Sequence, residues 1–158
     1  MNIRRAEAKD MPKICDLLNQ VLDVHHKGRP DLFEGNCRKY TNAELAEIIA
    51  DDTRPIFVAE IDGSVQGYAF TVITQHKNDN ILTDIKTLYI DDLCIDENAR
   101  GKHIGSAIYA YVKAYARSIG CYNVTLNVWG CNNDALRFYE KCGLGVQKMV
   151  WKKYCKSG

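Results

Sequence analysis

Apolar residues recur along the chain at two spacings, and each spacing predicts one type of element. A spacing of three or four residues predicts helices, whereas alternation or a short apolar run predicts strands. We expect helices over 10–25, 41–50, 104–119 and 133–141, with strands over 3–6, 56–61, 65–74, 83–95, 122–128 and 146–154. Asp10 is expected to cap the first helix, and Thr41 with Glu44 forms a capping box for the second.

Turn residues define how these elements connect. Asp62-Gly63 lies between two strand patterns and is typical of a β-hairpin. Strand, helix and strand over 83–128 form a right-handed crossover with one parallel pair. The fold class expected is α+β: a mixed, mostly antiparallel central sheet flanked by helices, in a single domain over 1–158.

Composition excludes several classes of protein. A formal net charge of +1 argues against a nucleic-acid partner. No apolar run reaches the ~20 residues of a membrane span, and the first residues lack a signal-peptide pattern. The seven cysteines are an odd number without a Cys-x-x-Cys pair, so neither disulfides nor a metal site is expected. Reduced thiols favour a cytoplasmic location.

The junction over 92–105 holds the strongest local signal. An apolar strand enters a loop with Arg100, Gly101 and Lys102, and a helix begins near Ile104. Free N–H groups at a helix start attract anions, and glycine permits close approach of a phosphate. The interpretation is a pyrophosphate-binding loop; the alternative is an ordinary strand-to-helix turn with solvated basic residues.

The stretch 25–40 shows no clean period and is expected to be a partly ordered loop. A long loop after the first helix is a plausible substrate lid. Its adjacent histidines, His25 and His26, offer a metal or base site, although loop polar groups of no special function are the commoner case.

Two motifs together resemble the GNAT superfamily of acyl-CoA-dependent N-acyltransferases. The run from Arg100 to Gly105 is similar to that family's Arg/Gln-x-x-Gly-x-Gly/Ala loop. The run from Asn132 to Gly143 is similar to its Asn-x-x-Ala-x-x-Phe-Tyr-x-x-x-Gly signature. One departure is His103, which stands where the family usually has glycine. If that position needs a positive φ, histidine costs some strain and alters CoA binding.

The resemblance implies acetyl-CoA as the acyl donor. It implies that the backbone of the strand pairs with the pantetheine arm, that the loop amides hold the pyrophosphate, and that the second motif completes the cofactor site near the sulfur. The cofactor-binding residues expected on this basis are Leu93, Cys94, Ile95, Arg100, Gly101, Lys102, His103, Ile104, Gly105, Ser106, Asn132, Ala135, Phe138 and Tyr139.

The chemistry of amine acetylation then suggests catalytic residues. Only roughly one amine in 2,500 is unprotonated at pH 7 if its pKa is 10.4, so a proton must be removed before attack. By resemblance to polyamine-acetylating relatives, Asp91 is the candidate base, and alternation places it on the face of Leu93 and Ile95. Tyr139 is the candidate acid for the leaving thiolate. The expected substrate-binding residues are Asp91, Asp92, His26, Phe33 and Glu34.

The function expected is therefore an N-acetyltransferase, an acyltransferase that moves the acetyl group of acetyl-CoA to a small cationic primary amine. Direct attack through a tetrahedral intermediate is expected, with no metal. The alternatives are acetylation of a protein lysine or N-terminus, and a non-catalytic domain that senses CoA or binds a partner. A homodimer is common for this architecture. The acceptor's identity cannot be read from the sequence.

Overall fold

The computed structural model describes residues 1–35 and 37–156. The chain divides into two compact units, Met1–Asn127 and Val128–Gly158, which are described separately. The elements of the first unit are β1 (Asn2–Arg5), a 3-10 turn η1 (Ala8–Asp10), α1 (Met11–Gly28), α2 (Asn42–Ala50), β2 (Ile56–Ile61), β3 (Ser64–Gln75), β4 (Lys86–Ile95), η2 (Glu97–Ala99), α3 (Ile104–Ser118) and β5 (Asn123–Leu126). The prediction of one domain over 1–158 stays a prediction.

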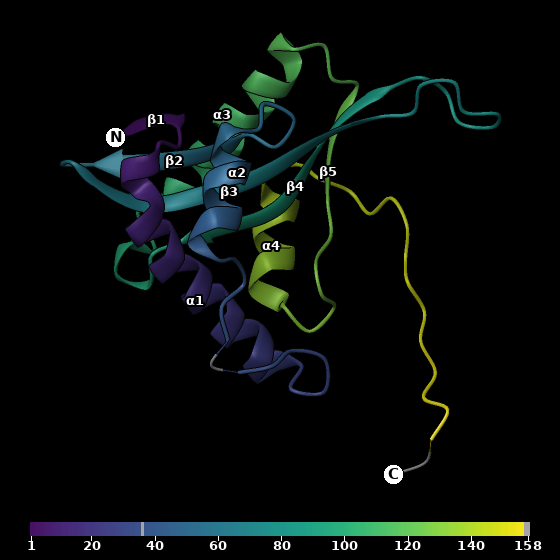
Figure 1. The fold of residues 1–158 in the computed structure, drawn as a ribbon. Coiled ribbons are helices and arrows are strands. Elements are labelled where there is room, and N and C mark those ends of the chain that lie inside the picture. The colour runs from purple at the N-terminus through teal and green to yellow at the C-terminus, as the bar shows by residue number, and fades with distance from the viewer. Residues whose placement is uncertain (36, 157–158) are drawn as a thin grey trace. The chain divides into compact units, whose positions relative to one another are not determined.

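The first unit is built on a five-stranded sheet in the order β1-β2-β3-β4-β5 (Figure 1). Neighbours are antiparallel except for β4 and β5, which are parallel because α3 carries the chain back between them. The predicted mixed, mostly antiparallel sheet with one crossover is confirmed. Asp62 and Gly63 both have positive φ at the β2–β3 turn, as a hairpin turn of this type requires.

Helices cover both faces of this sheet. On one face, α1 and α2 pack on Ile56, Val58, Tyr68 and Phe70; on the other, α3 packs on Phe57 and other side chains of the sheet. Residues 56–59 therefore bury every side chain, which is why that strand reads as a continuous apolar run and not as an alternation. The central strands are held between two cores.

The first helix differs from its prediction at both ends. Asp10 does not cap α1 with its side chain; it accepts a hydrogen bond from the Glu7 amide (2.8 Å) and pairs with Arg4 (2.8 Å). Arg4 also contacts Glu60 (2.6 Å), so Arg4 ties β1 both to β2 and to the buried carboxylate of Asp10. The helix continues to Gly28 because His25 and His26 remain helical. The capping box of α2 is confirmed, with Thr41 and Glu44 exchanging both bonds.

The second unit contains α4 (Asn133–Lys141), as predicted, followed by a segment without regular structure. Gly143, at φ 88°, ends the helix, and the Leu144 amide bonds back to Tyr139 (3.1 Å). The strand predicted over 146–154 is wrong: these residues form no ladder, and Val150 and Trp151 are 93% and 87% exposed. An alternating pattern forms a strand only where the edge of another strand is available for pairing.

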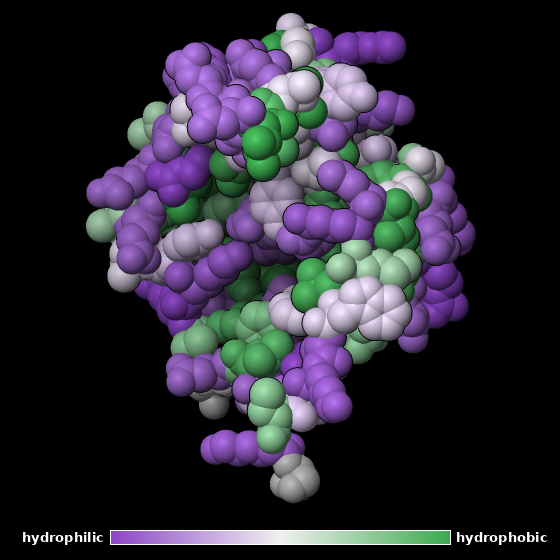
Figure 2. All heavy atoms as spheres, turned by 90° about the vertical axis from the view of Figure 1, so that its right-hand side faces the viewer, coloured by the Kyte–Doolittle hydropathy of each residue, from purple (hydrophilic) through white to green (hydrophobic). Residues whose placement is uncertain are grey.

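On the face in Figure 2, hydrophilic side chains surround separate groups of hydrophobic ones.

Candidate functional site

Strand β4 loses one of its two neighbours halfway along. Its pairing with β5 ends at Ile90, opposite Leu126, whereas its pairing with β3 continues to Ile95. Among the described strands, the backbone groups of residues 91–95 that face away from β3 have no partner. A free strand edge of this kind can bind an extended ligand that carries amide groups.

A β-bulge sits where this free edge begins. Phe70 pairs with Asp92 and the next residue, Thr71, pairs with Ile90, so Asp91 is the extra residue. Leu93 and Ile95 therefore stay on the α3 face, while Asp91 points toward Lys39 and Asp92 toward Tyr68 on the other face. The prediction that Asp91 shares a face with Leu93 and Ile95 is wrong, because the bulge interrupts strict alternation.

The bulge gathers two carboxylates around one ammonium. Lys39 Nζ lies 3.6 Å from Asp91 Oδ2, and the Tyr68 hydroxyl donates to Asp92 Oδ2 (2.6 Å). Burial raises the pKa of Asp92 despite the hydrogen bond from Tyr68 and the charge of Lys39. Burial alone would lower the pKa of Lys39, but the charge of Asp92, followed by smaller effects that include Asp91, raises it on balance. The site therefore favours a bound cation.

Two residues after Asp92 on β4, the thiol of Cys94 is buried. Burial raises its pKa to about 12, and its neighbours include the Asp92 charge. A thiol in such surroundings stays protonated near pH 7 and is a poor nucleophile. Cys94 is therefore a poor candidate for a covalent acyl intermediate.

The loop after β4 is anchored to α1. Asp96 is buried, pairs with Lys13, and accepts a hydrogen bond from the Asn98 amide (3.0 Å). The Gln20 side chain accepts from the Glu97 amide (3.2 Å). The hydrogen bonds from Lys13 and the Asn98 amide lower the pKa of Asp96. These contacts fix the loop's path before it reaches the basic residues.

The start of α3 remains open to a ligand. His103 precedes the helix at φ 59° and ψ 21°, and its side chain does not cap the helix. It therefore adopts the left-handed conformation that glycine would adopt without strain. Gly101 (φ 79°) has no atom within 4 Å of the place where a Cβ would stand. Arg100, Lys102 and His103 are exposed around this helix start.

The predicted lid residues hold one another in place. His26 Nδ1 lies 2.7 Å from the Phe33 carbonyl oxygen, and the His25 ring contacts the Phe33 ring in a tilted arrangement, with centroids 5.0 Å apart. Glu34 is exposed. No cluster of three His, Cys, Asp or Glu side chains suited to a metal occurs in the described part of the chain. His26, Phe33 and Glu34 stay predicted substrate contacts.

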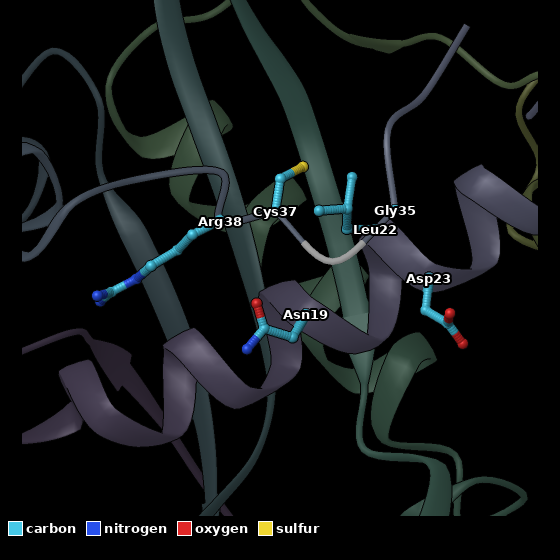
Figure 3. Close-up of a pocket in the computed structure, with 6 residues that line it drawn as sticks. All are labelled: Asn19, Leu22, Asp23, Gly35, Cys37 and Arg38. Atoms are coloured by element: carbon cyan, nitrogen blue, oxygen red, sulfur yellow. The ribbon is translucent and has the colours of Figure 1, made fainter. Parts of the chain in front are cut away.

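A pocket of about 420 Å³ lies between α1 and the segment that joins α1 to α2 (Figure 3). Its lining residues are Asn19, Leu22, Asp23, Gly35, Cys37 and Arg38. The side chains of Arg38 and Asp23 point away from each other in that view. None of the lining residues belongs to β4 or to the basic loop, so this pocket is not the cavity in which the predicted chemistry would occur.

In the second unit, Asn132 precedes α4, the short helix that carries Tyr139. The Asn132 side-chain oxygen caps α4 by accepting from the Ala135 amide (3.1 Å). The Phe138 and Tyr139 rings are 5.0 Å apart in an edge-on arrangement. Ala135 is half-buried. The cap gives Asn132 a structural role, and its predicted contact with the cofactor stays a prediction.

Two residues of the acidic site were missed from the sequence. Tyr68 reads as an ordinary apolar strand position, and Lys39 lies in a stretch without periodicity. The bulge did leave a signal: the apolar positions 88, 90, 93 and 95 skip one residue at the two acids.

Comparison with known proteins identifies the family. The sequence model of the acetyltransferase (GNAT) family matches residues 19–144, and the chain belongs to this family. A mutant form of the BH1408 protein from Bacillus halodurans has the same fold, with a TM-score of 0.94, 26% identity, and coverage of 99% of this chain and 100% of that chain. The family predicted from the two motifs, and the predicted fold class, are confirmed.

Curated relatives include glucosamine 6-phosphate N-acetyltransferases. The one from Arabidopsis thaliana is 33% identical over 69 residues, which are 44% of each protein. The structure of an Arabidopsis thaliana glucosamine-6-phosphate N-acetyltransferase aligns over 98% of both chains with a TM-score of 0.71 and 26% identity. The sequence alignments cover only 44%, 40% and 35% of the first curated relatives. No helix among the described residues is long and apolar enough to cross a membrane.

Proposed function

We propose that the protein transfers the acetyl group of acetyl-CoA to a small primary amine, which Asp91 and Asp92 bind as its ammonium ion. One observation carries the proposal: the carboxylate pair stands at the start of the unpaired half of β4. A thioester ligand along that edge and a cation at its end would be neighbours.

The residues present fit acetyl-CoA. The free edge of β4 offers backbone donors and acceptors to the amides of a pantetheine arm. The open helix start at His103 and the space beside Gly101 suit a pyrophosphate, and Arg100 and Lys102 add positive charge. Bound acetyl-CoA would supply the activated acetyl group. Unpaired N–H groups of β4 are the donors for charge that develops on the acetyl oxygen.

The acids would bind the acceptor and take its proton. An ammonium ion has three N–H donors, which two carboxylates can accept. Asp92 is the candidate proton acceptor, because burial raises its pKa above its ordinary value. From the family motif, Tyr139 donates a proton to the departing thiolate, while Asn132 contacts the cofactor.

The acceptor class is an amino sugar or another small amine. The relatives named as glucosamine 6-phosphate N-acetyltransferases make that sugar the first to test. The acid pair favours the ammonium that such a sugar carries.

The test measures CoA release from acetyl-CoA with glucosamine 6-phosphate, glucosamine, polyamines, aminoglycosides and lysine peptides. We expect turnover with one class and a loss of about a hundredfold in kcat for Tyr139→Phe. Tyr122→Phe, a change at an exposed tyrosine, should retain full activity. Binding of acetyl-CoA without turnover of any amine would favour the non-catalytic alternative, and full activity of Tyr139→Phe would remove the acid role.

A further inference from the structure

In the protein without substrate, Lys39 is the cation that pairs with Asp91. It lies between α1 and α2, with Nζ 3.6 Å from Asp91 Oδ2 and 5.4 Å from the centre of the Tyr40 ring. Asp92 acts on it through its charge. Lys39 therefore presents an ammonium group to an acid pair, a phenol ring and the free edge of β4.

The ion pair between Lys39 and Asp91 is weak enough for another cation to replace Lys39. The distance of 3.6 Å is longer than a good charge-assisted hydrogen bond. The side chains of Lys39 and Asp91 are 40% and 37% exposed, and exposed pairs of this kind contribute little stability. The next residue, Tyr40, stacks on Phe70 at 5.9 Å, so the segment stays attached to the core without Lys39.

We propose that Lys39 occupies the position of the acceptor's ammonium ion and is displaced from Asp91 when the acceptor binds. This inference rests on the proposed function. The lysine side chain ends in a primary ammonium, so it has the donors of the group that the site would receive. Lys39 is thus a specificity residue, because it keeps the acids neutralised until a competing cation arrives.

The proposal predicts competition between Lys39 and the acceptor. Without the lysine charge, an incoming ammonium would not have to displace a partner, so it should bind more tightly. From the usual strength of an exposed ion pair, the gain is about two- to fivefold in Kd. The bound amine would meet the same acids, so kcat should not change.

Calorimetry with CoA present would measure the Kd of glucosamine and of putrescine. We expect Lys39→Met to bind both about two- to fivefold more tightly than wild type, and Lys39→Arg, which keeps the charge, to bind like wild type. Lys27→Met removes another exposed pair, with Asp23, and should have no effect. Where turnover is measured, KM should fall without a change in kcat.

Three results would overturn the proposal: equal Kd values for wild type and Lys39→Met, weaker binding by Lys39→Met, or no binding of either probe. Glucosamine 6-phosphate serves as a third ligand. If Lys39→Met weakened the binding of that sugar alone, Lys39 would be a phosphate contact. Failure of the proposed function has a different signature. Both probes would bind with the predicted order of Kd values, yet no variant would release CoA from acetyl-CoA.

Discussion

Asp92 and Asp96 lie four residues apart, yet their surroundings move their pKa values in opposite directions. At Asp96, hydrogen bonds from Lys13 and a backbone amide outweigh burial and lower the pKa. At Asp92, burial outweighs the Tyr68 hydroxyl and the Lys39 charge, and the pKa is raised. A carboxylate with enough hydrogen-bond and charge partners stabilises the fold. One with too few partners has a raised pKa, which suits it to accept a proton in a reaction.

The largest effect should come from replacing Asp92, whose pKa is raised. Asp92→Asn should lower kcat/KM for the amine by about a hundredfold, because it removes a proton acceptor and a charge. Its melting temperature should stay equal or rise, because the ionised carboxylate is unfavourable where it stands. Steady-state kinetics and thermal unfolding measure the two effects. A marked fall in the melting temperature would make Asp92 a structural residue.

Asp96→Asn is the matched change and should affect the other property. It leaves the Lys13 ammonium without its buried partner, and the loss in the free energy of unfolding should be about 2 kcal/mol. For a chain of this size that corresponds to a fall of roughly 4–8 °C in the melting temperature. An unchanged melting temperature would show that the ion pair contributes nothing.

The pH dependence of stability should separate the acids again. Because the folded pKa of Asp96 is below its unfolded value of 3.8, its contribution is present above that pH and is lost as the pH falls through the folded pKa. Asp92 has the opposite sign: its folded pKa is above 3.8, so its effect on stability worsens as the pH rises from 3.8 through the folded pKa. Between pH 7 and pH 2, the fall in melting temperature should therefore be smaller in Asp96→Asn than in wild type. In Asp92→Asn it should not be smaller. The same curve for both variants would contradict this.

The smallest effect is expected at His103, beyond the loop that Asp96 anchors. His103→Gly should relieve the left-handed conformation, and His103→Val should cost about 1 kcal/mol of stability, because a β-branched residue tolerates positive φ poorly. CoA affinity should be equal or higher in His103→Gly, as measured by calorimetry. A clearly weaker glycine variant would assign the histidine ring a role in binding.

Most of the fold could be predicted because its signals are local. The capping box at Thr41 and the Asp62-Gly63 turn each depend on neighbouring residues, and both are found in the structure. The strand expected over 146–154 failed because a strand also needs a partner edge, which a pattern along one segment does not reveal.

The site could be predicted only in part, for a similar reason. The basic loop is contiguous in sequence, so its residues were found together. The acid site joins Lys39, Tyr68 and Asp91 from three distant segments, and it depends on a bulge that changes which face each acid takes. Alternation alone assigned Asp91 to the wrong face.

The order of strands in the sheet, which follows the order in the chain, also bears on how the molecule assembles. The turn between β2 and β3 spans two residues, Asp62 and Gly63, whereas joining β1 to β2 encloses both α1 and α2. The entropy lost on closing a loop grows with its length. We therefore expect the central hairpins to form early and the outer strands to join once the helices between them are in place. The free half of β4 would then belong to a part of the sheet that is organised before the rest of the protein.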